Sequence, residues 1–189
     1  ADEAAFYGAN LQGAFFREAL LERAHFEDAD LQLADLSGAS LLDGYFYGAN
    51  LSKANLTDAD LAGTDLRRTN LRQATLRRAN LQGALLDSAT LDGTSLVEAD
   101  LESAYLDDAS LVQADLHEAS LRGADFRYAR LTNANLQRAN LENANIEGAN
   151  LAKARLNSAT MTMSVLYKAN LTSANLHGAR LHHAVLIDA

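Results

Sequence analysis

The side chains that could perform catalysis or bind a metal are scattered along this chain. Its five histidines are His25, His117, His177, His182 and His183, and only the last three lie close together in the sequence. The acids and serines form no recognisable set of nucleophile, base and orienting group. The chain has no cysteine, so it can form neither a disulfide nor a thiolate metal site. The sequence therefore predicts no catalytic residue, no cofactor and no metal site.

The composition restricts the class of protein. A net charge of −9 argues against direct nucleic-acid binding, which normally requires a basic patch. Hydrophobic residues make up 48% and charged residues 22%, as in a folded globular domain. No apolar run approaches the roughly 18 residues of a membrane helix, so we expect no membrane span. The compartment stays open: cytoplasmic, or periplasmic or lumenal if Ala1 is a processed N-terminus.

A five-residue period runs through the whole chain. Every fifth residue from Phe6 to Leu186 is Leu, Phe, Ile or Met, at all 37 positions. Two residues earlier, Ala occupies 32 of 37 positions. The exceptions are small residues, namely Gly44, Thr64, Thr69, Thr94 and Ser164. Such strict internal repetition is typical of a solenoid.

This period is incompatible with an amphipathic helix. Five residues rotate a helix by about 500°, so successive Leu side chains would point about 140° apart and form no apolar stripe. In an extended segment, residues two apart point the same way, so each Ala-x-Leu directs one small and one large side chain inward. The other two residues can turn the chain, and Gly is common at the second of them.

The repeat resembles that of the pentapeptide repeat proteins. The motif reads Ala-Asn-Leu-Gln-Gly at 9–13 and Ala-Asn-Leu-Ser-Lys at 49–53, and the resemblance covers residues 4–188. It implies an all-β fold, a right-handed quadrilateral parallel β-helix in which each coil has four five-residue sides. The 189 residues would form one solenoid domain, 1–189, of about nine 20-residue coils.

The charges provide an independent indication of a 20-residue coil. With that period, residues 20 apart lie above one another, and opposite charges there attract. The predicted contacts are Arg67 with Asp87, Arg72 with Asp92, Arg78 with Glu98, Glu118 with Arg138, and the columns Glu102–Arg122–Glu142 and Asp107–Arg127–Glu147. Asp87 above Asp107 is an exception to this tendency.

An arginine-rich segment interrupts the acidic sequence. Residues 66–80 contain five Arg and no acid, whereas residues 81–118 contain nine acids and no base. The arginines are Arg67, Arg68, Arg72, Arg77 and Arg78. We interpret them mainly as intramolecular partners of the acidic coils, although exposed pairs of this kind contribute little individually.

The same period places all six tyrosines on one side of the rod, the side of residues 5–8 and every twentieth residue after them. Two interpretations remain open: an aromatic ladder that stabilises one sheet, or a face that binds a protein partner. The candidate interaction face consists of Tyr7, His25, Tyr45, Tyr47, Leu85, Tyr105, Tyr128, Val165 and Tyr167.

The C-terminal coil is apolar where a polar cap would be expected. The residues concerned are Leu181, Val185, Leu186 and Ile187. Either a capping segment is absent from this sequence, or two copies form a homodimer through this coil. The sequence leaves both alternatives open.

These observations predict a non-enzymatic β-helix that acts as a protein-interaction or structural scaffold module with an unidentified protein partner. The resemblance implies an alternative, a DNA mimic of the quinolone-resistance type that binds DNA gyrase. Duplex DNA carries about one charge per 1.7 Å, or about 26 over a rod of about 44 Å. The net charge of −9 falls far short of that density.

Overall fold

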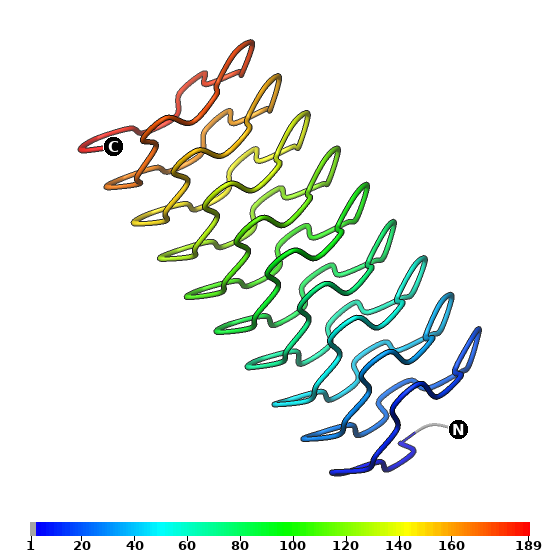
Figure 1. The fold of residues 1–189 in the computed structure, drawn as a ribbon. Coiled ribbons are helices and arrows are strands. Elements are labelled where there is room, and N and C mark those ends of the chain that lie inside the picture. The colour runs from blue at the N-terminus through cyan, green and yellow to red at the C-terminus, as the bar shows by residue number, and fades with distance from the viewer. Residues whose placement is uncertain (1–2) are drawn as a thin grey trace.

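The computed structural model describes residues 3–189 as a stack of square coils with the two termini at opposite ends (Figure 1). Every β-bridge is parallel and joins residues 20 apart, from Ala5–His25 to Val165–Val185. Each coil therefore takes 20 residues, arranged as four sides of five. Residues 3–189 form no helix and no continuous strand, because each side contributes one bridged residue and then turns.

The corner of each side is a β-turn closed by a backbone hydrogen bond. The N–H of Ala114, for example, donates to the carbonyl of Leu111 at 3.1 Å. The second central residue of each turn has a φ between 54° and 71°, which ten glycines and 28 other residues adopt. A positive φ at this position defines a type II turn and explains why Gly is frequent there. The sequence prediction of a two-residue turn is confirmed.

Backbone hydrogen bonds join each coil to the coils on both sides of it. Leu106 N–H donates to the carbonyl of Asp125 at 2.7 Å, and Asp108 N–H donates to that of Arg127 at 3.0 Å, both in the following coil. Tyr105 N–H donates in the other direction, to Ala84 at 2.9 Å. Single bridged residues thus produce a ladder without extended strands.

The two apolar frames of the repeat form the core. Leu106 and Ala114, for example, are 0% and 1% exposed. The hydroxyls in the alanine frame are satisfied by backbone carbonyls: Thr64 donates to Leu61 at 2.6 Å, and Thr94 donates to Leu71 in the preceding coil at 2.7 Å. A Cβ on Gly44 would lie 2.9 Å from the carbonyl oxygen of Leu41, so this position needs glycine.

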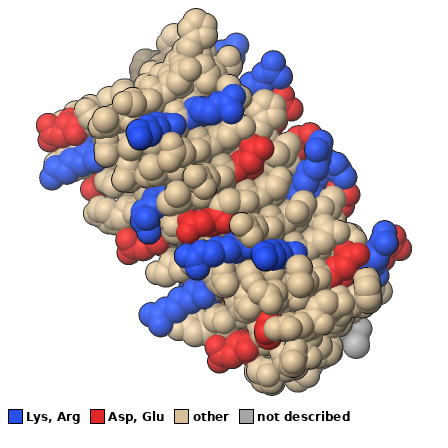
Figure 2. All heavy atoms as spheres, viewed as in Figure 1, with Lys and Arg blue, Asp and Glu red and all other residues tan. Residues whose placement is uncertain are grey.

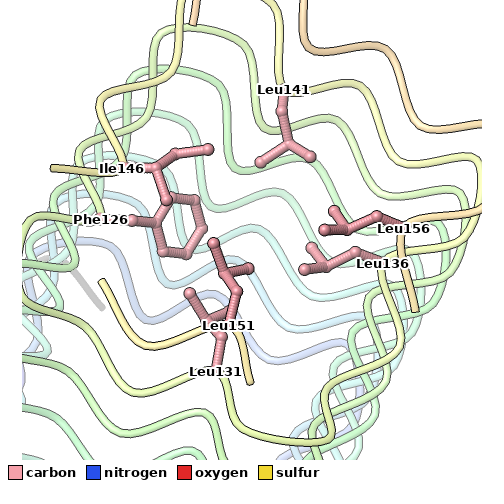
Figure 3. Close-up of a pocket in the computed structure, with 7 residues that line it drawn as sticks. All are labelled: Phe126, Leu131, Leu136, Leu141, Ile146, Leu151 and Leu156. Atoms are coloured by element: carbon pink, nitrogen blue, oxygen red, sulfur yellow. The ribbon is translucent and has the colours of Figure 1, made fainter. Parts of the chain in front are cut away.

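Large side chains from all four sides meet along the axis and fill it. Figure 3 shows seven of them pointing inward, with residues 20 apart lying above one another: Phe126, Leu131, Leu136, Leu141, Ile146, Leu151 and Leu156. The space that they enclose is too small for a water molecule. This part of the interior therefore offers no cavity for a ligand.

Asn and Asp are frequent at the bridged position because their side chains bond both within and between coils. The Asn50 side-chain oxygen accepts the N–H of Ser52 at 3.2 Å, and its amide donates to Asp30 at 3.0 Å. Asn70 continues the column by donating to Asn50 at 3.0 Å. These ladders stabilise the corner and the register together.

The filled core predicts that Ala114→Leu destabilises the protein strongly, because the three added carbons have no space. We expect a loss of about 3 kcal/mol or more, beyond the usual range for small increases in core volume. Melting temperature measures the effect, with the neighbouring exposed Gln113→Gly as control. Equal melting temperatures for the two variants would contradict this packing.

Candidate interaction face

We use the term tyrosine face for the outward side chains on the side that carries residues 5–8 and every twentieth residue after them. At its N-terminal end, three rings form a column. The ring centroids of Tyr7 and His25 lie 4.9 Å apart, and those of His25 and Tyr45 lie 4.6 Å apart. His25 Nδ1 also lies 3.0 Å from Glu27 Oε1. Burial raises the pKa of the Tyr7 hydroxyl, and the Glu27 carboxylate raises it further.

A second aromatic column supports this one from inside. Phe6, Phe26 and Phe46 stack with ring centroids 4.7 Å apart at each step. Stacking of this kind stabilises a column beyond simple burial of its surface. The outer rings still reach solvent, with Tyr7 59% and Tyr45 40% exposed. The N-terminal part of the tyrosine face is therefore an exposed aromatic surface on a packed wall.

Farther along the face, the aromatic residues are separated by charges. Tyr105 and Tyr128 are exposed, whereas Leu85, Val165 and Tyr167 are half-buried. Two ion pairs interrupt the face, Asp65–Arg67 at 2.6 Å and Asp125–Arg127 at 2.7 Å. The structure thus brings the rings of Tyr7, His25 and Tyr45 together, and a parallel β-bridge places Leu85 beside Tyr105.

Basic groups lie against two of the tyrosines. The guanidinium carbon of Arg68 lies 5.7 Å from the ring centroid of Tyr47, and the ammonium of Lys168 lies 4.8 Å from that of Tyr167. Cations over an aromatic ring are attracted by its electron-rich face. These two tyrosines are thereby held in place on the surface.

Several of the predicted charge pairs between coils are confirmed. Arg72 lies 3.3 Å from Asp92, and Arg138 lies 2.9 Å from Glu118. Arg122 lies between two carboxylates of its column, 4.0 Å from Glu102 and 3.8 Å from Glu142. Figure 2 shows acidic and basic side chains interspersed among uncharged residues on the face in view.

Other predicted pairs are not direct ion pairs, although Arg67 still attracts Asp87 and Arg127 still attracts Asp107. Arg67 binds Asp65 in place of Asp87, and Arg127 binds Asp125 in place of Asp107 and Glu147. In both cases an acid two residues earlier on the same side contacts Nε and Nη2 of the arginine, so a two-point contact forms there. This contact lowers the pKa of the Asp65 carboxyl.

The predicted pair of Arg78 with Glu98 is not a direct ion pair either, although the two charges attract each other. Arg78 binds Asp58, in the preceding coil, at 2.6 Å, and Glu98 binds Arg77 at 2.8 Å. Each of these charged residues had more than one oppositely charged neighbour in the adjacent coils. The sequence alone did not show which neighbour it would bind. Four of the five arginines at 66–80 are in ion pairs, and the fifth, Arg68, lies over Tyr47.

Comparisons with known proteins agree with this geometry. The family model described as pentapeptide repeats matches the sequence in eight copies, at residues 2–38, 30–68, 45–83, 54–93, 84–123, 94–133, 124–162 and 149–188. The chain belongs to the pentapeptide repeat family. Comparison with functionally curated proteins found no match.

Solved structures of pentapeptide repeat proteins have the same architecture. HetL, a pentapeptide repeat protein involved in heterocyst differentiation regulation from the cyanobacterium Nostoc sp., is 38% identical over 98% of this chain and 84% of its own, with a TM-score of 0.96. A trypsin-treated form of QnrB1, a plasmid-mediated fluoroquinolone resistance protein, is 20% identical over 96% of this chain and 90% of its own, with a TM-score of 0.72. The pentapeptide repeats thus form a right-handed quadrilateral β-helix, as predicted.

The pentapeptide coil at the C-terminal end exposes most of the residues predicted there. Val185, Leu186 and Ile187 are 39%, 40% and 61% exposed, and Leu181 is half-buried. Homodimer formation through this coil remains a prediction. In residues 3–189, no group of three His, Asp or Glu side chains could hold a metal ion, and no helix is long and apolar enough to cross a membrane.

Sequence reasoning missed three exposed apolar residues near the N-terminal end. Phe15, Leu20 and Leu33 are 83%, 68% and 60% exposed. The repeat could have predicted their exposure, because each of these three residues lies at a repeat position whose side chain points outward and is usually polar. These residues lie on sides other than the tyrosine face, so the apolar surface of the first coils extends around the rod.

One acid of the tyrosine face is unfavourably placed. Burial raises the pKa of the Asp107 carboxyl, and the nearby carboxylates of Asp108, Asp125 and Asp87 raise it further against the opposing effect of Arg127. Its Oδ1 is buried and has no hydrogen-bond partner. Because the folded state binds this proton more tightly, stability from Asp107 is fully present below its unfolded pKa and is lost as pH rises through its folded pKa.

We therefore expect Asp107→Asn to raise the melting temperature at pH 7, since it removes a partly buried charge, and to leave it nearly unchanged at pH 3. Thermal melts at the two pH values measure this. The adjacent exposed Asp108→Asn is the matched control and should have little effect at either pH. A lower melting temperature for Asp107→Asn at pH 7 would show that the ionised carboxylate is stabilising.

Proposed function

We propose that this pentapeptide repeat protein is a non-enzymatic interaction scaffold and that its tyrosine face binds a protein partner. The observation that carries the proposal is the group of exposed aromatic rings on this one side, including Tyr7, Tyr45 and Tyr105. Tyrosine is enriched in protein interfaces because it combines a large apolar ring with a hydrogen-bonding hydroxyl. A side that carries several exposed tyrosine rings suits recognition better than stability alone.

The architecture supports a binding role over catalysis. Active sites are usually concave and collect convergent polar groups. The described interior is packed with Leu and Ala, and the repeat has no loop that could build a pocket. A rod of about nine coils, about 44 Å long, would instead present an extended, rigid surface.

The relatives are compatible with this proposal to different degrees. HetL, at 38% identity, is described as involved in the regulation of differentiation, a role that suits a protein which binds other proteins. The likeness to QnrB1 is one of fold, at 20% identity. The alternative of a gyrase-binding DNA mimic gains no specific support from the surface, because the arginines at 66–80 interrupt its acidic residues.

The proposal predicts that Tyr105→Ala abolishes capture of the partner from host lysate while changing the melting temperature little, because the side chain is 49% exposed. Capture on immobilised protein, followed by mass spectrometry, measures the first effect. Leu33→Ala is the control, since it removes an exposed apolar side chain (60% exposed) from another side of the rod. If both variants retain the same partners as the original protein, the tyrosine face is not the binding surface.

A further inference from the structure

Tyr47 lies midway between charges of opposite sign on the tyrosine face. Glu27 and Asp28 lie one coil toward the N-terminus, and Arg67 and Arg68 lie one coil toward the C-terminus in the same two columns. The coil between them presents exposed, uncharged rings. The sequence of charges along the rod is therefore negative, apolar and positive, at equal spacing.

Two of these charges lack an opposite charge within the protein. In residues 3–189, no ion pair engages either Asp28 or Arg68. Both side chains nevertheless lie toward the central coil. A Cβ on Gly48 would come 2.5 Å from the Asp28 carboxylate, and the Arg68 guanidinium lies 5.7 Å from the Tyr47 ring centroid. Unpaired acid and unpaired base thus flank an exposed Tyr47, which is 38% accessible.

This arrangement is complementary to itself. Consider a two-fold axis that runs through Tyr47, parallel to the surface and perpendicular to the rod. The rotation reverses the order of the coils and keeps the columns, as an isologous contact requires. Asp28 then faces Arg68 of the partner subunit, and His25 faces Asp65 of the partner subunit. The Tyr47 rings meet at the centre.

We propose that a second copy of this chain binds antiparallel to the first through the tyrosine face around Tyr47. A parallel arrangement would bring the acidic coil that carries Glu27 and Asp28 to the level of its own copy, so charge selects the antiparallel one. The contact spans about five coils, or about 24 Å of the rod. An interface this narrow lies at the low end of the size range, so the dimer is weak and concentration-dependent. The inference rests on the proposed function, because it uses part of the same face.

Charge reversal tests this pairing directly. Asp28→Arg and Arg68→Asp each place like charges opposite one another, so each should raise the dimer dissociation constant about tenfold or more. The double variant restores both pairs with their signs exchanged and should return to within about threefold of the original value. Sedimentation velocity over a concentration series measures the constants, and melting curves check that every variant is folded.

Cross-linking tests the position of the axis. The natural chain has no cysteine, so Tyr47→Cys introduces a single thiol. Because this residue meets its own copy at the axis, a short bismaleimide should join two chains efficiently. Thr57→Cys, on the opposite side of the rod, is the control and should remain monomeric.

Three results would overturn the proposal: a monomer at about 1 mM, a double variant as weak as the single ones, or self-association that is lost in Leu186→Glu and unaffected by charge reversal. The last result would place the contact at the C-terminal coil. Tyr105 lies outside the central contact, which separates the two proposals. If Tyr105→Ala loses partner capture and the original protein does not dimerise, the proposed function stands without the dimer. If the original protein dimerises and Tyr105→Ala keeps its partners, only the dimer stands.

Discussion

The left-handed residue at each corner is the constraint on which the rest of this structure depends. It closes a type II turn after every core Leu or Phe and so limits each side to five residues. Residues other than glycine adopt this conformation at a cost of about 1 kcal/mol or more each. Hydrogen bonds to both neighbouring coils and burial of the large apolar side chains offset that cost. The unbroken repeat keeps all of these contributions in register.

The same constraint determines where function can lie. Two side chains of every five point inward, and the space that they enclose between residues 126 and 156 is too small for a water molecule. The three remaining side chains point outward. Residue types at these outward positions can vary without changing the fold, so they determine what the surface can bind. The tyrosine face results from such choices on one side, supported from inside by Phe6, Phe26 and Phe46.

Ion pairs on these walls follow both the 20-residue period and the local geometry of a single side. An Arg at the first turn position can reach an acid two residues earlier, as in Arg67–Asp65 and Arg127–Asp125. It can also reach along its column in either direction, as Arg122 does toward Glu102 and Glu142. Arg78, at the second turn position, reaches Asp58 in the preceding coil. The arginine-rich segment is largely neutralised in this way, whereas Arg68 remains over Tyr47 and contributes a positive charge to the tyrosine face.

The sequence by itself determined the five-residue side, the 20-residue coil, the Ala/Leu core and the side of the rod on which the tyrosines lie. These features follow from one strict period, because the direction of each side chain depends only on its place in the repeat. The tertiary structure decided which acid each arginine binds, which rings come into contact, as Tyr7, His25 and Tyr45 do, and that Asp107 is partly buried. Those outcomes depend on competition among neighbours in the same side and in two adjacent coils. The sequence shows which charged and aromatic side chains could interact. Only their positions in the folded protein determine which of these contacts form.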